Sequence, residues 1–159
     1  MTELTSLHID KQSHKFSAAH YTIFSATERE RLHGHNYAVS ARFVAPMGDN
    51  GFAADYNVYK RRIAQLCDEL DEYTLLAGES PFQHIEEDGV YYRVHFDRDQ
   101  MLFLRSDTRV LPIRNATVEE FSRYLLARLL ELSAADGLRE VEVSVASGPS
   151  QRASAIWRS

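Results

Sequence analysis

Residues 32–45 read LHGHNYAVSARFVA, and this stretch decides how the rest of the chain is interpreted. From Tyr37 onward, apolar and polar side chains alternate, which is the pattern of a β-strand with one buried face. The stretch also contains His33 and His35, which are two residues apart. Because side chains at that spacing point to the same face of a strand, the two imidazoles are expected side by side.

Two helices are predicted on either side of a long segment without helical periodicity. Within residues 55–70, apolar side chains recur at the spacing of one helix face. They are Ile63, Leu66, Cys67 and Leu70. Thr117 opens the second helix, because Thr117 and Glu120 fit a capping box. Its apolar stripe consists of Phe121, Leu125, Leu129 and Leu132.

The remaining segments complete an α+β interpretation. Residues 7–16 are extended, residues 141–145 alternate between valine and polar side chains, and residues 152–157 suggest a last short strand. The element order is therefore β-β-α-α-β-β. We expect a four-stranded antiparallel sheet with both helices packed on one face. Such a sheet has exposed edges, so we also expect a homo-oligomer.

The chain has no internal repeat, and we interpret residues 1–159 as one domain. Residues 77–114 lie between the two helices and carry little helical periodicity. Within them, YYRVHF at residues 91–96 and MLFLR at residues 101–105 flank the segment DRDQ. This arrangement predicts a β-hairpin.

Composition excludes several classes of function. Lys and Arg number 18, Asp and Glu number 23, and the net charge is -5, whereas nucleic-acid phosphates favour clustered basic residues. No apolar run is long enough to span a bilayer, and the N-terminus lacks the apolar stretch of a signal peptide. The only cysteine is Cys67, so an intrachain disulfide is excluded. Together these features predict a cytoplasmic protein without nucleic-acid or membrane partners.

The histidines predict a zinc site. Zinc binds imidazole nitrogens, and a catalytic zinc has three protein ligands and one open position. His20 ends the extended segment FSAAH and would join His33 and His35 as the third ligand. The alternative is that His33 and His35 are two ordinary surface histidines. The other histidines lie in polar or hairpin segments and are expected at the surface. They are His8, His14, His84 and His95.

Four motifs along the chain match one known family. They are FSAAH followed by LHGHNY, GFAADY at residues 51–56, LDEYTL at residues 70–75, and ATVEE at residues 116–120. These motifs resemble the 6-pyruvoyltetrahydropterin synthase and 6-carboxytetrahydropterin synthase family over most of the chain. The exception is residues 77–114, which by this comparison form an enlarged insertion. The resemblance implies the T-fold, trimeric rings that pair into hexamers, and an active site between subunits. The zinc ligands that it implies are His20, His33 and His35.

Two catalytic positions depart from the family pattern. The family's catalytic cysteine lies four residues before the first histidine of HGH, and this chain has Arg29 there. Cys67 is no simple substitute, because it lies on the apolar stripe of a helix and is expected to be a small buried hydrophobe. The family's proton relay pairs an aspartate with a histidine. Here Asp71 is followed by Glu72.

A subgroup of the family replaces the cysteine with a glutamate in the pattern Glu-x-x-His-Gly-His. Glu30 fits that pattern. The resemblance to this subgroup implies cleavage of the dihydroneopterin side chain to 6-hydroxymethyldihydropterin. The alternative is that Glu30 is a solvated carboxylate in the charge run ERER.

The substrate-binding positions also differ. The family anchors the pterin ring with a glutamate that accepts two N–H groups, and Ser147 occupies that position here. Glu142 does not replace it, because Glu142 points to the other face of the predicted strand. Thr117 would contact the pterin in the family, although its place in the capping box explains it equally well.

The resemblance therefore implies a zinc-dependent lyase that cleaves or eliminates within the side chain of dihydroneopterin or its triphosphate. Zinc would polarise a side-chain oxygen, and a carboxylate would act as the general base. Glu30 is the first candidate for that base, and Asp71 and Glu72 are the second. Two alternatives are the same zinc site acting on a non-pterin small molecule, and a non-catalytic zinc-binding protein.

Overall fold

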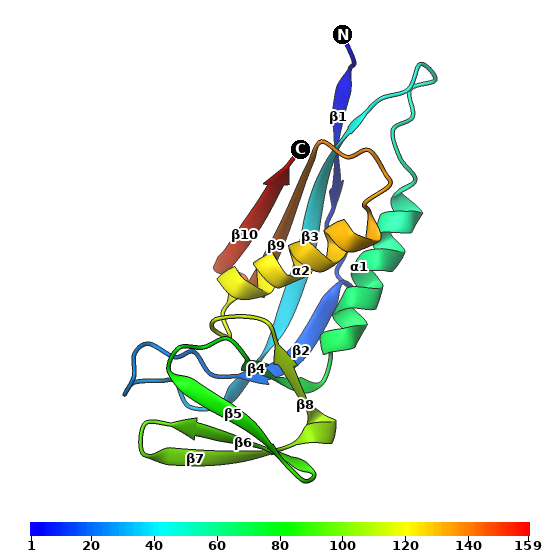
Figure 1. The fold of residues 1–159 in the computed structure, drawn as a ribbon. Coiled ribbons are helices and arrows are strands. Elements are labelled where there is room, and N and C mark those ends of the chain that lie inside the picture. The colour runs from blue at the N-terminus through cyan, green and yellow to red at the C-terminus, as the bar shows by residue number, and fades with distance from the viewer.

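The long strand β3 (His33–Pro46) is the centre of the main sheet in the computed structural model, which describes residues 1–159 (Figure 1). One side of β3 pairs antiparallel with β9 (Glu140–Gly148), which in turn pairs with β10 (Gln151–Arg158). The other side is shared by two short strands, β1 (Leu4–Ile9) and β2 (Lys15–His20). β2 covers the half of β3 that begins with the histidines, and β1 covers the other half.

The prediction of one extended segment over residues 7–16 is wrong, because the chain turns between β1 and β2. The backbone N–H of His14 donates to the carbonyl oxygen of Lys11 at 2.9 Å, and the carbonyl oxygen of His14 then accepts from Val39. The polar residues at this turn favour a break in the strand. His14 itself is 2% exposed, so its predicted place at the surface is also wrong.

The main sheet has seven strands rather than the four predicted. β4 (Tyr73–Ala77) lies parallel to β2, and β8 (Thr108–Leu111) lies parallel to β4. β4 and β8 are short, and their apolar residues are adjacent in sequence. They therefore lack the alternation of apolar and polar residues that indicates the other strands. The α+β class and the antiparallel order of the remaining strands agree with the prediction.

Two helices, α1 (Tyr56–Leu70) and α2 (Val118–Leu132), pack on one face of the sheet, as predicted (Figure 1). Their apolar stripes and the inward side chains of the strands form one core. Cys67 lies in it and is 1% exposed. The capping box at α2 is half formed. The Thr117 hydroxyl accepts from the Glu120 N–H at 3.3 Å, while the Glu120 carboxylate turns to Arg114.

A separate three-stranded antiparallel sheet lies within residues 77–114. It consists of β5 (Gln83–Asp88), β6 (Tyr91–Phe96) and β7 (Asp99–Leu104). β6 and β7 form the hairpin expected from the sequence, whereas β5 was not predicted because its sequence QHIEED is mostly polar. The inner face of this small sheet packs against the chain that follows β2. The shared cluster contains Tyr21, Ile23, Leu76, Val94 and Phe96.

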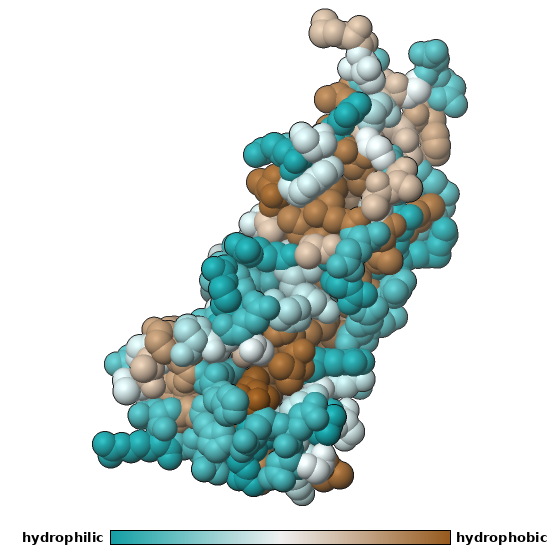
Figure 2. Space-filling model, in the orientation of Figure 1, coloured by the Kyte–Doolittle hydropathy of each residue, from teal (hydrophilic) through white to brown (hydrophobic).

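An apolar groove of about 540 Å³ runs between α2 and β10. Figure 2 shows apolar surface between these elements, while most of the remaining visible surface is polar. The outer edge of β10 pairs with no other strand. No helix in the structure has the length and apolar character needed to cross a membrane.

Candidate metal centre

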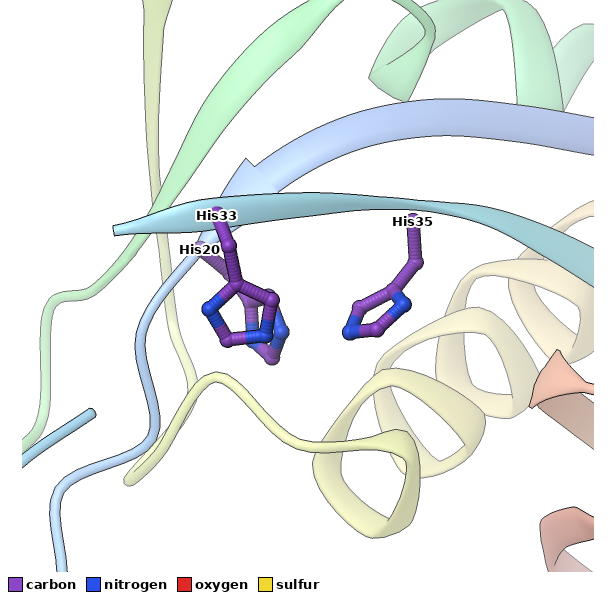
Figure 3. A group of neighbouring side chains, drawn as sticks. All are labelled: His20, His33 and His35. Carbon is purple, nitrogen blue, oxygen red and sulfur yellow. The ribbon is translucent and has the colours of Figure 1, made fainter. Parts of the chain in front are cut away.

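Three imidazole rings converge where β2 ends and β3 begins (Figure 3). His20 is the register partner of His33 across the two strands, and His35 lies two residues further along β3 on the same face. One ring nitrogen from each histidine can be chosen so that all three lie within 4.8 Å of one another. Strand pairing therefore brings together the three residues that the sequence proposed as metal ligands.

Backbone carbonyl groups orient two of the rings. The Nδ1 atom of His20 lies 2.7 Å from the carbonyl oxygen of Ala116, and the Nδ1 atom of His33 lies 2.7 Å from that of Arg31. A carbonyl oxygen only accepts, so each Nδ1 carries the proton and each Nε2 presents a lone pair. The Nε2 atom of His20 is buried and has no hydrogen-bond partner. Burial also lowers the pKa of His20, which favours the neutral ligand form.

These features fit a zinc ion. Zinc accepts imidazole nitrogen, and ligating histidines commonly donate their second ring nitrogen to a carbonyl group. The buried and unpaired Nε2 of His20 is the feature that a metal would satisfy. No fourth side chain belongs to the group of potential ligands. Three histidines with no fourth protein ligand match the donor set of a catalytic zinc site rather than that of a structural one.

His20 and His35 line a cavity of about 260 Å³. Its walls come from the chain after β2, the start of β3, the N-terminus of α2 and the turn between β9 and β10. Most of its lining side chains are polar. The residues that line it are His20, Thr22, Glu30, His35, Tyr37, Thr117, Val118, Glu119, Ser147 and Gln151.

Glu30 lies beside the histidines. Its Oε2 atom is 3.9 Å from the Nε2 atom of His33, and its Oε1 atom accepts from the backbone N–H of Thr22 at 2.9 Å. Burial opposes ionisation of Glu30, but hydrogen bonds from Thr22 and the nearby histidines outweigh it and lower the pKa of the carboxyl group. The site therefore holds a carboxylate ready to accept a proton next to the three imidazoles.

Comparison with known proteins agrees with this geometry. Residues 8–156 match the family model described as 6-pyruvoyl tetrahydropterin synthase. The chain belongs to the 6-pyruvoyl tetrahydropterin synthase family.

Three relatives illustrate the similarity within this family. A Methanocaldococcus jannaschii protein that carries the name 6-carboxy-5,6,7,8-tetrahydropterin synthase is 29% identical over 96% of this chain and 94% of its own. The crystal structure of the Plasmodium vivax 6-pyruvoyl tetrahydropterin synthase aligns with a TM-score of 0.91 and 27% identity, over 98% of this chain and 99% of its own. The Plasmodium falciparum enzyme aligns with a TM-score of 0.91 and 26% identity, over 98% of each chain. In two further P. vivax structures, a glutamate described as a catalytic residue is replaced by alanine or by cysteine.

Both predicted substrate-binding residues line the cavity. Thr117 caps α2 and faces the histidines, and Ser147 lies at the end of β9. The hydroxyl oxygen of Ser147 accepts from the side-chain amide of Gln151 at 2.7 Å. Gln151 and Glu119 also line the cavity, and the sequence analysis did not select them. Glu119 falls within the family-like motif ATVEE, which was the available signal, whereas Gln151 lies just beyond a turn and gave none.

Asp71 and Glu72, the second candidates for the general base, do not line the cavity of their own chain. Asp71 follows α1, and its carboxylate accepts from the backbone N–H of Ser17 at 2.7 Å. Glu72 adopts a positive φ of 65° and donates its backbone N–H to the carbonyl oxygen of Ser17 at 2.7 Å. In the single chain, both residues form hydrogen bonds that connect the start of β4 to β2.

Neither Arg29 nor Cys67 supplies a nucleophile to the cavity. Arg29, at the position of the family's catalytic cysteine, lies against the rings of Tyr21 and Phe96 under the small sheet. Cys67 is buried in the main core, and burial raises the pKa of its thiol to about 12. The thiolate form that nucleophilic attack requires is therefore disfavoured.

Proposed function

We propose that this protein is a zinc-dependent lyase that acts on the side chain of a reduced pterin, dihydroneopterin or its triphosphate. One observation carries the proposal: three histidines with no fourth protein ligand lie together, and two of them, His20 and His35, line a cavity that Glu30 also lines. Membership of the family supports the pterin, and the ligand set supports the metal.

His20, His33 and His35 would hold the zinc. When bound there, zinc acts as a Lewis acid that polarises an oxygen atom of the substrate side chain. The carbonyl groups of Ala116 and Arg31 keep two of the rings in the ligand tautomer. These contacts fix which ring nitrogen of His20 and of His33 presents a lone pair to a metal ion, which reduces the ordering that binding requires.

Glu30 is the proposed general base. In a retro-aldol cleavage, its carboxylate would accept the proton of a side-chain hydroxyl, a carbonyl group would form there, and the electron pair of the broken carbon–carbon bond would pass to the pterin fragment, which is then protonated. In an elimination, it would accept a proton from carbon, a carbon–carbon double bond would form, and the oxygen group on the next carbon would leave with the electron pair of the carbon–oxygen bond. The P. vivax relative, whose catalytic residue is described as a glutamate, supports this assignment. Arg29 and Cys67 offer no competing nucleophile, as their positions show. Asp71 and Glu72 would enter only from a neighbouring subunit.

Glu119 is the proposed anchor for the pterin ring. Ser147 lacks the carboxylate that the family uses, but Glu119 lines the same cavity and forms no ion pair within the chain. A carboxylate accepts the paired N–H groups of a pterin through charge-assisted hydrogen bonds. The amide of Gln151, held on Ser147, adds a further polar contact at this wall.

We further propose that the chain forms a homo-oligomer, a trimer or a dimer of trimers. The unpaired edge of β10 and the apolar groove between β10 and α2 support this proposal. An exposed strand edge is a site for pairing with another sheet, and a large apolar patch is costly to leave in water. Light scattering of the purified protein gives the mass directly, and a monomer at micromolar concentration would contradict the proposal.

A second candidate function is the same chemistry on a non-pterin heterocycle, and the serine at position 147 favours it. Two measurements decide between the candidates. The zinc-loaded protein is incubated with dihydroneopterin and with its triphosphate, and products are separated by chromatography. Pterin binding is measured by fluorescence in parallel. Turnover of either compound supports the lyase. Absence of both binding and turnover contradicts it and leaves the non-pterin substrate.

A further inference from the structure

The guanidinium group of Arg29 lies against two aromatic rings. Its central carbon is 5.3 Å from the ring centroid of Tyr21 and 5.7 Å from that of Phe96. Its Nη1 atom donates to the carbonyl oxygen of Glu30 at 2.9 Å, and its Nε atom is buried without a partner. Cation–π contacts are strongest where water is excluded, so the rings offset part of the cost of burying this charge.

Glu30 is held at three points. Its carbonyl oxygen accepts from Arg29, and its backbone N–H donates to the carbonyl oxygen of Thr22 at 2.8 Å. Its carboxylate accepts from the Thr22 N–H at 2.9 Å. Only the first of these contacts involves a side chain from outside the Thr22–Glu30 pair. Arg29 therefore links the backbone of Glu30 to the surrounding structure.

Phe96 connects this contact to the inserted sheet. It belongs to β6 and is 3% exposed, in the cluster that joins the small sheet to Tyr21 and Ile23. Arg29 thus contacts the small sheet, while the next residue, Glu30, lies beside His33. An insertion that looks peripheral in Figure 1 therefore contacts Arg29, which donates to the backbone carbonyl group of the candidate base.

We propose that Arg29 is a positioning residue, and that Arg29 and Phe96 together hold the Glu30 carboxylate toward the histidines. The inference rests on the proposed function for the role of Glu30. Arginine suits the position because its planar group stacks on both rings while still donating a hydrogen bond. A displacement of about 1 Å in a catalytic group lowers turnover by roughly 100-fold.

The test uses the zinc-loaded protein with Arg29→Met, which keeps the length of the side chain and removes its charge and donors. We expect kcat to fall by about 10- to 100-fold, with KM changed by less than about two-fold because Arg29 does not line the cavity. The zinc content stays that of the wild type. Arg29→Lys keeps the charge and one donor and restores part of kcat.

Arg105→Met is the matched control. The Arg105 guanidinium stacks on Tyr92 in the same small sheet, 5.4 Å from its centroid, and makes no contact with Glu30. We expect this variant to keep the wild-type kcat. If Arg105→Met lowers kcat as much as Arg29→Met, general weakening of the small sheet explains both, and the proposal is wrong.

Hydrogen exchange gives a readout that does not depend on turnover. The amides of Thr22 and Glu30 are expected to exchange faster in Arg29→Met, while those of β3 and β9 keep their wild-type rates. Unchanged exchange at Thr22 and Glu30 overturns the proposal. If Glu30→Gln retains full turnover, the proposed base is wrong, and the exchange result still decides whether Arg29 holds the loop. Phe96→Leu, which retains Arg29 and removes one ring, is the second variant if Arg29→Met fails to fold.

Discussion

The Oε2 atom of Glu30 lies 3.9 Å from the Nε2 atom of His33. The two residues are three apart in sequence, but the carboxylate reaches the imidazole because Glu30 precedes β3 and is held by Thr22. A metal ligand and a candidate base thus come from one short segment. The pattern Glu-x-x-His-Gly-His therefore corresponds to a defined spatial arrangement.

Replacing Glu30 with glutamine tests its role as the base. The amide keeps the size of the side chain but accepts no proton, so we expect kcat to fall by about 100- to 10,000-fold. The zinc content is expected to stay unchanged, since Glu30 is not one of the three ligands. Glu28→Gln, an exposed carboxylate in the same loop, is the control. Full turnover by Glu30→Gln would show that Glu30 is not the general base. Asp71 or Glu72 of a neighbouring subunit would then be the next candidate.

Replacing His33 with alanine tests the metal centre. The side chain of His33 is 37% exposed, so its loss disturbs the core little and the variant is expected to fold. We expect the wild type to retain about one zinc ion per chain after dialysis and the variant to retain almost none, by elemental analysis. His95→Ala, a histidine paired with Glu86 on the small sheet, should keep the wild-type zinc content. Equal zinc in both variants would rule out the three-histidine site.

Periodicity and strand register account for what the sequence predicted. The stripes of α1 and α2 follow the helical repeat, and the spacing of His33 and His35 fixes their common face. His20 joins them because β2 pairs with the start of β3, with His20 opposite His33. Patterns that repeat locally, such as these, can be recognised from the sequence alone.

Non-local pairing accounts for what the sequence missed. β4 and β8 join the sheet in parallel across long stretches of chain, and no local signal encodes such partners. β5 pairs through its backbone although its side chains are polar. Gln151 and Glu119 reach the cavity from two different elements that only the tertiary fold brings together. Arg29 was recognised as a departure from the family, but its contact with Phe96 depends on the inserted sheet.

Replacing Ser147 with glutamate tests whether the cavity is built for a pterin. The new carboxylate would stand at the family's anchor position, in the cavity that Glu119 also lines, and would accept N–H groups of the ring in addition to those bound by Glu119. We expect the affinity for dihydroneopterin to rise about 10-fold or more, because a hydrogen bond to a charged group contributes about 1.5–3 kcal/mol. Fluorescence titration measures the change.

Ser144→Glu provides the control for this substitution. Ser144 lies on the opposite face of β9, where its hydroxyl is 2.6 Å from that of Ser154. A glutamate there adds the same charge away from the cavity and should leave pterin affinity unchanged. If Ser147→Glu binds dihydroneopterin no better than the wild type, the N–H groups of the pterin do not reach position 147, and Glu119 remains the only proposed anchor.

His14 makes the stability of the fold depend on pH. Burial lowers its pKa below the usual 6.5, and Lys11 and Lys60 lower it further, while a backbone contact from Lys60 partly opposes them. The unfolded chain therefore binds a proton at His14 near pH 6.5 when the folded chain does not. The stability that the neutral ring permits is fully present above pH 6.5 and is lost as the pH falls toward the lower, folded-state pKa.

The pH dependence is measured by urea unfolding of the wild type and His14→Gln at pH 8 and at pH 5.5. Glutamine keeps polar atoms at the site but does not titrate. We expect the free energy of unfolding to fall more steeply with acid in the wild type than in His14→Gln. His8→Gln, at an exposed position on β1, should follow the wild type. Both variants keep the three metal-centre histidines, so any contribution from these residues is the same in all three proteins. Parallel curves for the wild type and His14→Gln would show that His14 contributes nothing to acid sensitivity.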